Sequence, residues 1–145
     1  MATDPSEFRT EGPHSPELTA AAARQVADMV RFLVYASTPS SGGLADPGDA
    51  CDLLGELHTA TQRLPQLLGQ LQAFLDAQLA SGRIGDDRGR DPGPLAWNAA
   101  AHLAGAQARA AEVTAELRAA QNAIAGLYVK GGTDAHGGTD DQDHR

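Results

Sequence analysis

The chain has 145 residues and a net charge of −8 at pH 7, from 11 lysine and arginine residues against 19 acidic ones. One domain is expected at this length. The acidic balance argues against a nucleic-acid partner, which needs a basic surface, and against an anionic membrane surface. No apolar run approaches the ~20 residues of a membrane span, and Cys51 is the single cysteine. With no signal peptide expected, we predict a cytoplasmic location.

The first predicted helix spans about residues 16–37. Residues 1–14 carry charges and two prolines and are predicted to be a disordered lead. Ser15 is a suitable N-cap, and Pro16 fits the first helical position. Glu17 lies in the first turn, where the helix dipole favours a negative charge. The helix should end near Ser37, before Pro39. Its apolar face is formed by Leu18, Ala22, Val26, Met29, Val30 and Leu33.

A second helix is predicted over residues 47–81, capped by Asp46. Pro65 lies in its middle, lacks a backbone donor and clashes with the carbonyl of Thr61. Two outcomes are open, a kink or a break into two shorter helices, and the continuous apolar stripe favours the kink. The stripe consists of Ala50, Leu53, Leu54, Leu57, Leu64, Leu67, Leu68, Leu71, Phe74, Leu75 and Leu79.

A third helix should run over residues 92–130, after a polar, glycine-rich connector at residues 82–94. Its apolar residues repeat at alternating intervals of three and four, the heptad spacing of helices in coiled coils. This stripe consists of Leu103, Ala106, Ala110, Val113, Leu117, Ala120, Ile124 and Leu127. Residues 131–145 are predicted to be a disordered acidic tail.

These elements predict an all-α fold, an antiparallel bundle of three helices over residues 15–130, or of four if the second helix breaks at Pro65. The first helix is ~32 Å long and the others approach ~53–58 Å, so it can cover only part of them. The uncovered apolar face requires either that the second helix folds back at Pro65 or that a second copy covers it.

We therefore expect a non-catalytic protein that acts through protein–protein association, as a homodimer or with a helical protein partner. The predicted interface residues are Leu68, Leu71, Phe74 and Leu75, with Trp97 as an aromatic anchor.

The sequence gives little indication of a catalytic or metal-binding site. Asp49, Asp52 and Glu56 share a helix face, but the helix dipole alone favours acids there, and no Glu-x-x-His pattern occurs. No catalytic residue, metal or cofactor is predicted. The alternative is a small ligand-binding protein or enzyme with a polar pocket between helices. Its residues would be Asn98, His102 and Arg109, which follow one helix face.

Overall fold

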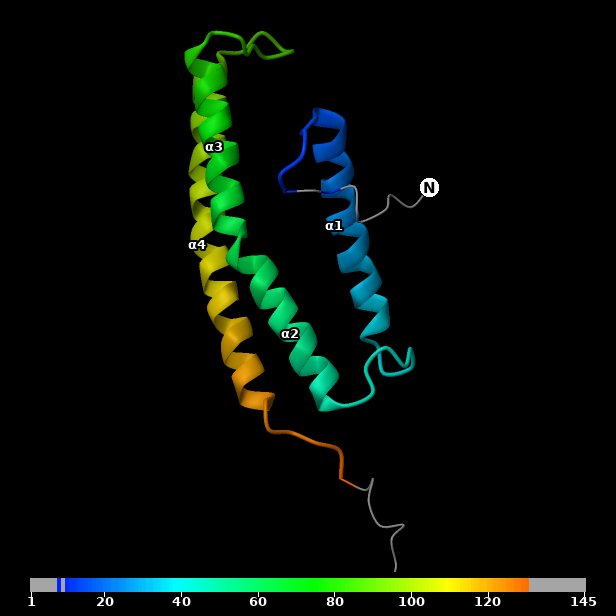
Figure 1. Cartoon of the computed structure of the whole chain (residues 1–145). Coiled ribbons are helices and arrows are strands. Elements are labelled where there is room, and N and C mark those ends of the chain that lie inside the picture. The colour runs from blue at the N-terminus through cyan, green and yellow to red at the C-terminus, as the bar shows by residue number, and fades with distance from the viewer. Residues whose placement is uncertain (1–7, 9, 131–145) are drawn as a thin grey trace, which may run out of the picture. The chain divides into compact units, whose positions relative to one another are not determined.

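The computed structural model describes residue 8 and residues 10–130, and within them the regular structure is entirely helical. Figure 1 shows the four helices, α1 (Pro16–Ala36), α2 (Pro47–Gln62), α3 (Leu64–Ala80) and α4 (Pro92–Ile124). The predicted all-α class is confirmed. Of the predicted disordered lead, residues 10–14 form a turn and irregular structure, and the rest, apart from residue 8, lies outside the described residues. The predicted acidic tail at 131–145 lies outside them as well.

The chain divides into two compact units, Met1–Ala45 and Asp46–Arg145. Each is described by itself, and the single bundle expected over residues 15–130 stays a prediction. In the first unit, α1 has the predicted cap, because the Ser15 hydroxyl accepts from the Leu18 N–H at 3.1 Å. The helix ends one residue before the predicted Ser37, whose N–H closes the last turn on the Leu33 carbonyl at 2.9 Å.

The second unit begins with a well-capped helix. The Asp46 carboxylate accepts from the N–H groups of Gly48 and Asp49 at 2.6 and 3.1 Å, and the Asp49 carboxylate accepts from the Asp46 N–H at 3.2 Å. This reciprocal capping box satisfies backbone donors that the first turn of a helix leaves without partners. The acidic residues at the start of α2 therefore have a structural role.

Near Pro65 two helices follow one another, and the single residue between them, Arg63, keeps a right-handed helical backbone with φ −92° and ψ −14°. α2 ends at Gln62 and α3 begins at Leu64, so that Pro65 falls in the first turn of α3. A proline is tolerated there because the first turn needs no N–H donor, whereas inside a helix it removes a hydrogen bond. Of the two alternatives for covering the apolar face, the fold-back at Pro65 does not occur, since α2 and α3 follow one another along α4 and both pack against it (Figure 1).

α4 begins at Pro92 as predicted but ends at Ile124, six residues before the predicted 130. Gly126 follows the cap residue Ala125, and the Leu127 N–H donates to the Ile124 carbonyl at 2.9 Å in a tight turn. Glycine costs about 1 kcal/mol in a helix interior, which favours termination here. Leu127 therefore lies beyond the helix, and the apolar stripe is one position shorter than predicted.

The packed side of α4 differs from the predicted stripe at two positions, Val113 and Ala120. One line of buried or half-buried side chains follows heptad spacing along α4, and Ala99 and Ala106 beside it are half-buried as well. The line consists of Ala96, Ala100, Leu103, Gln107, Ala110, Thr114, Leu117, Gln121 and Ile124. Ala96, at 8% exposure, is the one buried residue in the described part of the chain, and the other residues of this line are half-buried. Of the other predicted positions, Val113 is 49% exposed and Ala120 is exposed.

Hydrogen bonds between helices mark the polar positions of this packed side. Gln107 Nε2 donates to Gln72 Oε1 at 3.5 Å, and Gln121 Nε2 donates to the Cys51 carbonyl at 3.3 Å. Between them, His58 Nδ1 lies 3.0 Å from the carbonyl oxygen of Thr114 and donates to it, because a carbonyl can only accept. Buried polar groups require such partners, so these contacts determine which side of α4 faces α2 and α3.

Two glycines in the packed helices provide a matched test of this arrangement. A Cβ at Gly69 would lie 3.6 Å from the Gln107 side chain, an ordinary contact, whereas one at Gly55 would lie 2.6 Å from Gln121 Nε2. Gly69→Ala should therefore stabilise the protein by about 0.5–1 kcal/mol through helix propensity. Gly55→Ala must displace the Gln121 side chain and should give less or none of this gain. Thermal unfolding measures both, and an equal gain would contradict the packing.

Candidate functional site

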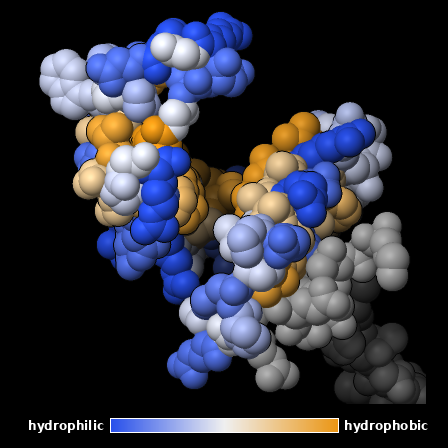
Figure 2. Space-filling model, turned by 90° about the horizontal axis from the view of Figure 1, so that it is seen from above, coloured by the Kyte–Doolittle hydropathy of each residue, from blue (hydrophilic) through white to orange (hydrophobic). Residues whose placement is uncertain are grey.

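An apolar groove runs between α3 and α4 in the second unit, with a volume of about 640 Å³. It is lined by Leu71, Phe74 and Leu75 of α3 and by Ala99, His102, Leu103 and Ala106 of α4. Figure 2 shows apolar side chains open at the surface of the molecule. Because large exposed apolar patches on soluble proteins mark sites of interaction, this groove is the candidate functional site.

The α3 wall exists because this helix has two apolar faces. Leu68, Gln72, Leu75 and Leu79 follow a 3-4-3-4 heptad pattern from Pro65 and are half-buried. Leu64, Leu67, Leu71 and Phe74 follow the same spacing one position earlier and are exposed. Among the exposed set, Phe74 is 59%, Leu67 51% and Leu71 46% accessible. One face thus packs on α4, and the other stands at the edge of the groove without cover.

The α4 wall consists of small and medium-sized side chains. Ala99, His102, Leu103 and Ala106 lie at relative positions i, i+3, i+4 and i+7 of the helix. Four residues with this spacing form the hole that receives one side chain of a neighbouring helix in knobs-into-holes packing. The α3–α4 groove therefore has a bulky wall on α3 and a hole on α4.

Three of the five predicted interface residues lie together in this groove, namely Leu71, Phe74 and Leu75. Leu68 does not line it and is half-buried on the packed face of α3. Trp97 does not line it either and is 81% exposed in the first turns of α4. Of the four residues of the hole on α4, His102 was predicted only as part of the alternative polar pocket, and Ala99, Leu103 and Ala106 were not predicted as a site.

Of the alternative polar pocket, the groove contains His102 alone. Asn98 and Arg109 do not line it, and Arg109 follows its own helix, with Nη1 3.4 Å from where a Cβ at Gly105 would lie. His102 is thus the single titratable side chain among the residues that line the groove. Within the described residues, no group of three or more histidine, cysteine, aspartate or glutamate side chains could hold a metal ion.

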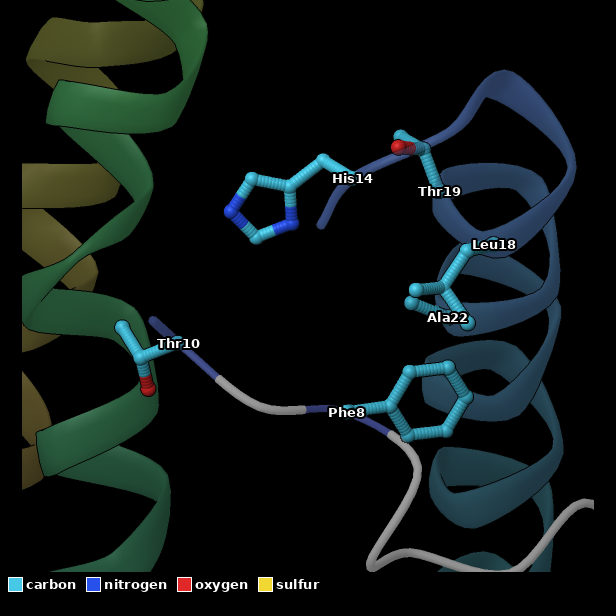
Figure 3. Close-up of a pocket in the computed structure, with 6 residues that line it drawn as sticks. All are labelled: Phe8, Thr10, His14, Leu18, Thr19 and Ala22. Atoms are coloured by element: carbon cyan, nitrogen blue, oxygen red, sulfur yellow. The ribbon is translucent and has the colours of Figure 1, made fainter. Parts of the chain in front are cut away.

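A second, smaller pocket lies within the first unit, with a volume of about 270 Å³. Its lining residues are Phe8, Thr10, His14, Leu18, Thr19 and Ala22. Figure 3 shows the ring of Phe8 directed toward the face of α1 that carries Leu18 and Ala22. This arrangement covers part of an apolar helix face, and it offers one titratable group, His14, with no partner for acid–base chemistry in the lining.

The connector before α4 is organised around one carboxylate. Asp86 accepts from Arg90 Nε and Nη2 at 2.9 and 2.7 Å, and from the backbone N–H groups of Arg88 and Arg90 at 3.0 and 3.2 Å. The Arg90 guanidinium is the main cause that lowers the pKa of Asp86 below its ordinary value, with smaller contributions from the two backbone groups. The connector thus brings the chain to α4 in a defined turn.

The stability of this turn should decrease when the Asp86 carboxylate is protonated at low pH. Because the folded-state pKa of Asp86 is lowered, its contribution is complete at neutral pH and is lost only as the pH falls through the folded-state value, below 3.8. The amide NMR signals of Arg88 and Arg90 should therefore titrate together with a midpoint below 3.8. In Asp86→Asn this titration should disappear, and a midpoint at or above the ordinary value in the wild type would contradict the assignment.

Comparisons with protein-family models, with curated proteins and with solved structures give no match for this chain. None of the described helices is both long and apolar enough to cross a membrane. The groove between α3 and α4 is therefore the feature from which a function can be inferred.

Proposed function

We propose that this chain is a non-catalytic helical-bundle protein that acts through protein–protein association, and that it self-associates through the α3–α4 groove. The observation that carries the proposal is the exposed apolar face of α3 beside the hole on α4, with Phe74 59% and Leu71 46% accessible. Side chains of this size are normally buried in folded proteins. Placed together on one face, they are typical of a surface that a partner covers.

The area involved supports association. The exposed parts of Leu67, Leu71 and Phe74 amount to roughly 100 Å² each, or about 300 Å² per copy. At ~25 cal/mol per Å², two copies gain about 15 kcal/mol, which is an upper value. Association itself costs about 4–15 kcal/mol. The three side chains can thus offset that cost but leave little excess, and the remaining groove residues must contribute for a stable complex.

A ligand-binding or enzymatic role has weaker support in the same groove. His102 is its one polar lining side chain, and the other two residues of the alternative polar pocket lie elsewhere on α4. A binding site for a small polar molecule normally combines an apolar lining with several converging polar groups. The groove therefore fits an apolar side chain of a helical partner better than a polar metabolite.

Light scattering after size exclusion tests the proposal directly. We expect a mass near twice 15.0 kDa at micromolar concentration, with dissociation on dilution. A mass of 15.0 kDa at every concentration would contradict self-association.

A further inference from the structure

We propose that two copies dock about a two-fold axis, so that Phe74 of each copy enters the hole formed by Ala99, His102, Leu103 and Ala106 of the other. This inference rests on the proposed self-association and adds the geometry of its contact. It starts from an asymmetry of the groove, in which the protruding side chains belong to α3 and the hole belongs to α4.

The hole on α4 requires a knob from outside the hairpin. Phe74 of the same chain lines the groove, yet it is 59% exposed, and the groove keeps a volume of about 640 Å³. Leu75, the neighbour that packs toward α4, does not close it either. A side chain that fills the hole must therefore come from another helix, and an aromatic ring or a leucine has the required size.

A second copy supplies such a knob on the face that also carries the hole. In a two-fold interface the same patch is used by both partners, so residue i contacts residue j and residue j contacts residue i. A bulky wall and a hole side by side on one face satisfy this condition, because a half-turn places each wall opposite the other copy's hole. Both contacts form at once and the assembly closes as a dimer.

The groove is the part of the surface where charge does not oppose a second copy. Each chain carries a net charge of −8, so two copies repel one another over most of their surfaces. The residues that line the groove include no carboxylate and no basic side chain other than His102. A partner selected by charge would need charged contacts here, whereas an apolar, uncharged face can meet a copy of itself without burying an unpaired ion.

The size of the face agrees with a dimer of ordinary dimensions. α3 has 17 residues and is therefore about 25 Å long, and two helices side by side are about 20 Å wide. Such a face approaches the ~800 Å² of accessible surface per partner that stable interfaces bury, once its corrugation is included. The face formed by α3 and α4 thus has the size that such a dimer requires.

A mixing experiment tests the geometry. Phe74→Lys and Ala106→Asp should each dissociate the dimer, because each places a lone charge in the interface. An equimolar mixture should associate at least ~10-fold more tightly than either variant alone. In the mixed dimer the lysine introduced into one chain meets the aspartate introduced into the other, and the second contact stays wild-type. Ala99→Asp replaces Ala106→Asp if circular dichroism shows that the latter variant is unfolded.

A second mixture serves as the control for the position of the axis. Phe74→Lys mixed with Phe74→Glu should not associate, because the two Phe74 side chains do not meet in the proposed geometry. Association of that mixture would place Phe74 on the axis and overturn the inference. A wild-type dimer that neither Phe74→Lys nor an alanine-to-aspartate variant dissociates would also overturn it while leaving self-association standing. A wild-type monomer would overturn both.

Discussion

Replacing Leu71 and Phe74 together by glutamate should reduce the mass in solution to that of one chain, 15.0 kDa, while the helix content stays unchanged. Both side chains are about half exposed in the single chain, so charges there do not disturb the packing of α3 on α4. In the proposed dimer they are central, and central aromatic residues carry much of the binding energy. We expect the dissociation constant to rise at least ~100-fold, measured by light scattering over a dilution series.

The control for this variant adds the same charges on the other side of α3. Gln66 and Ala73 are exposed and lie seven residues apart, away from the groove. Gln66→Glu with Ala73→Glu should keep the wild-type mass. If this control dissociates to the same extent, net charge and not the groove governs association. If the Leu71 and Phe74 double variant keeps the wild-type mass, the groove is not the interface.

Leu117→Asp should lower the free energy of unfolding by about 3 kcal/mol, because it puts a charge into the packed side of α4. Leu117 is half-buried and lies between Thr114 and Gln121, the two α4 residues that bond α2. For the 100 residues of the second unit this corresponds to a melting temperature roughly 12–24 °C lower.

Ala119→Asp is the matched control, since Ala119 is exposed on the same helix two residues away. It should change the melting temperature by only a few degrees. Circular dichroism at a fixed protein concentration measures both variants, because dimer formation makes the melting temperature concentration-dependent. Equal losses in the two variants would mean that α4 packs on α2 through a different side.

Together with the glycine pair and the Asp86 titration, these variants test separate parts of the molecule. Leu71 and Phe74 report on the open face of α3, whereas Leu117 reports on the packed side of α4. The two sets should not be interchangeable. A substitution that lowers the melting temperature without dissociating the dimer affects the packed side of α4. One that dissociates the dimer without lowering the melting temperature affects the open face of α3.

Capping chemistry made the helix starts predictable. Ser15, Asp46 and Asp91 each accept a backbone N–H at the start of a helix, and each is followed by a proline that suits the first helical position. These signals are local, so they act without knowledge of the rest of the fold. The end of α4 was less predictable, because an alanine-rich helix continues until a weak signal such as Gly126 stops it.

The course of the chain at Pro65 needed the tertiary structure. The apolar stripe continues across Pro65, and the helices on both sides of it follow α4 because each packs on α4. An apolar pattern indicates which side chains must be buried by packing. It does not report whether the backbone between them is intact.

Local patterns were thus enough to predict the helical class, the starts of α1, α2 and α4, and Leu71, Phe74 and Leu75 as apolar candidates for an interface. Which side of α4 faces α2 and α3 depended on packing. Two heptad stripes share Leu103, Ala110, Leu117 and Ile124 and differ at the positions between them, which are Ala106, Val113 and Ala120 in one and Gln107, Thr114 and Gln121 in the other. The second stripe is half-buried, because the side chains of Gln107 and Gln121 and the carbonyl of Thr114 find hydrogen-bond partners on α2 and α3, whereas Val113 and Ala120 are exposed.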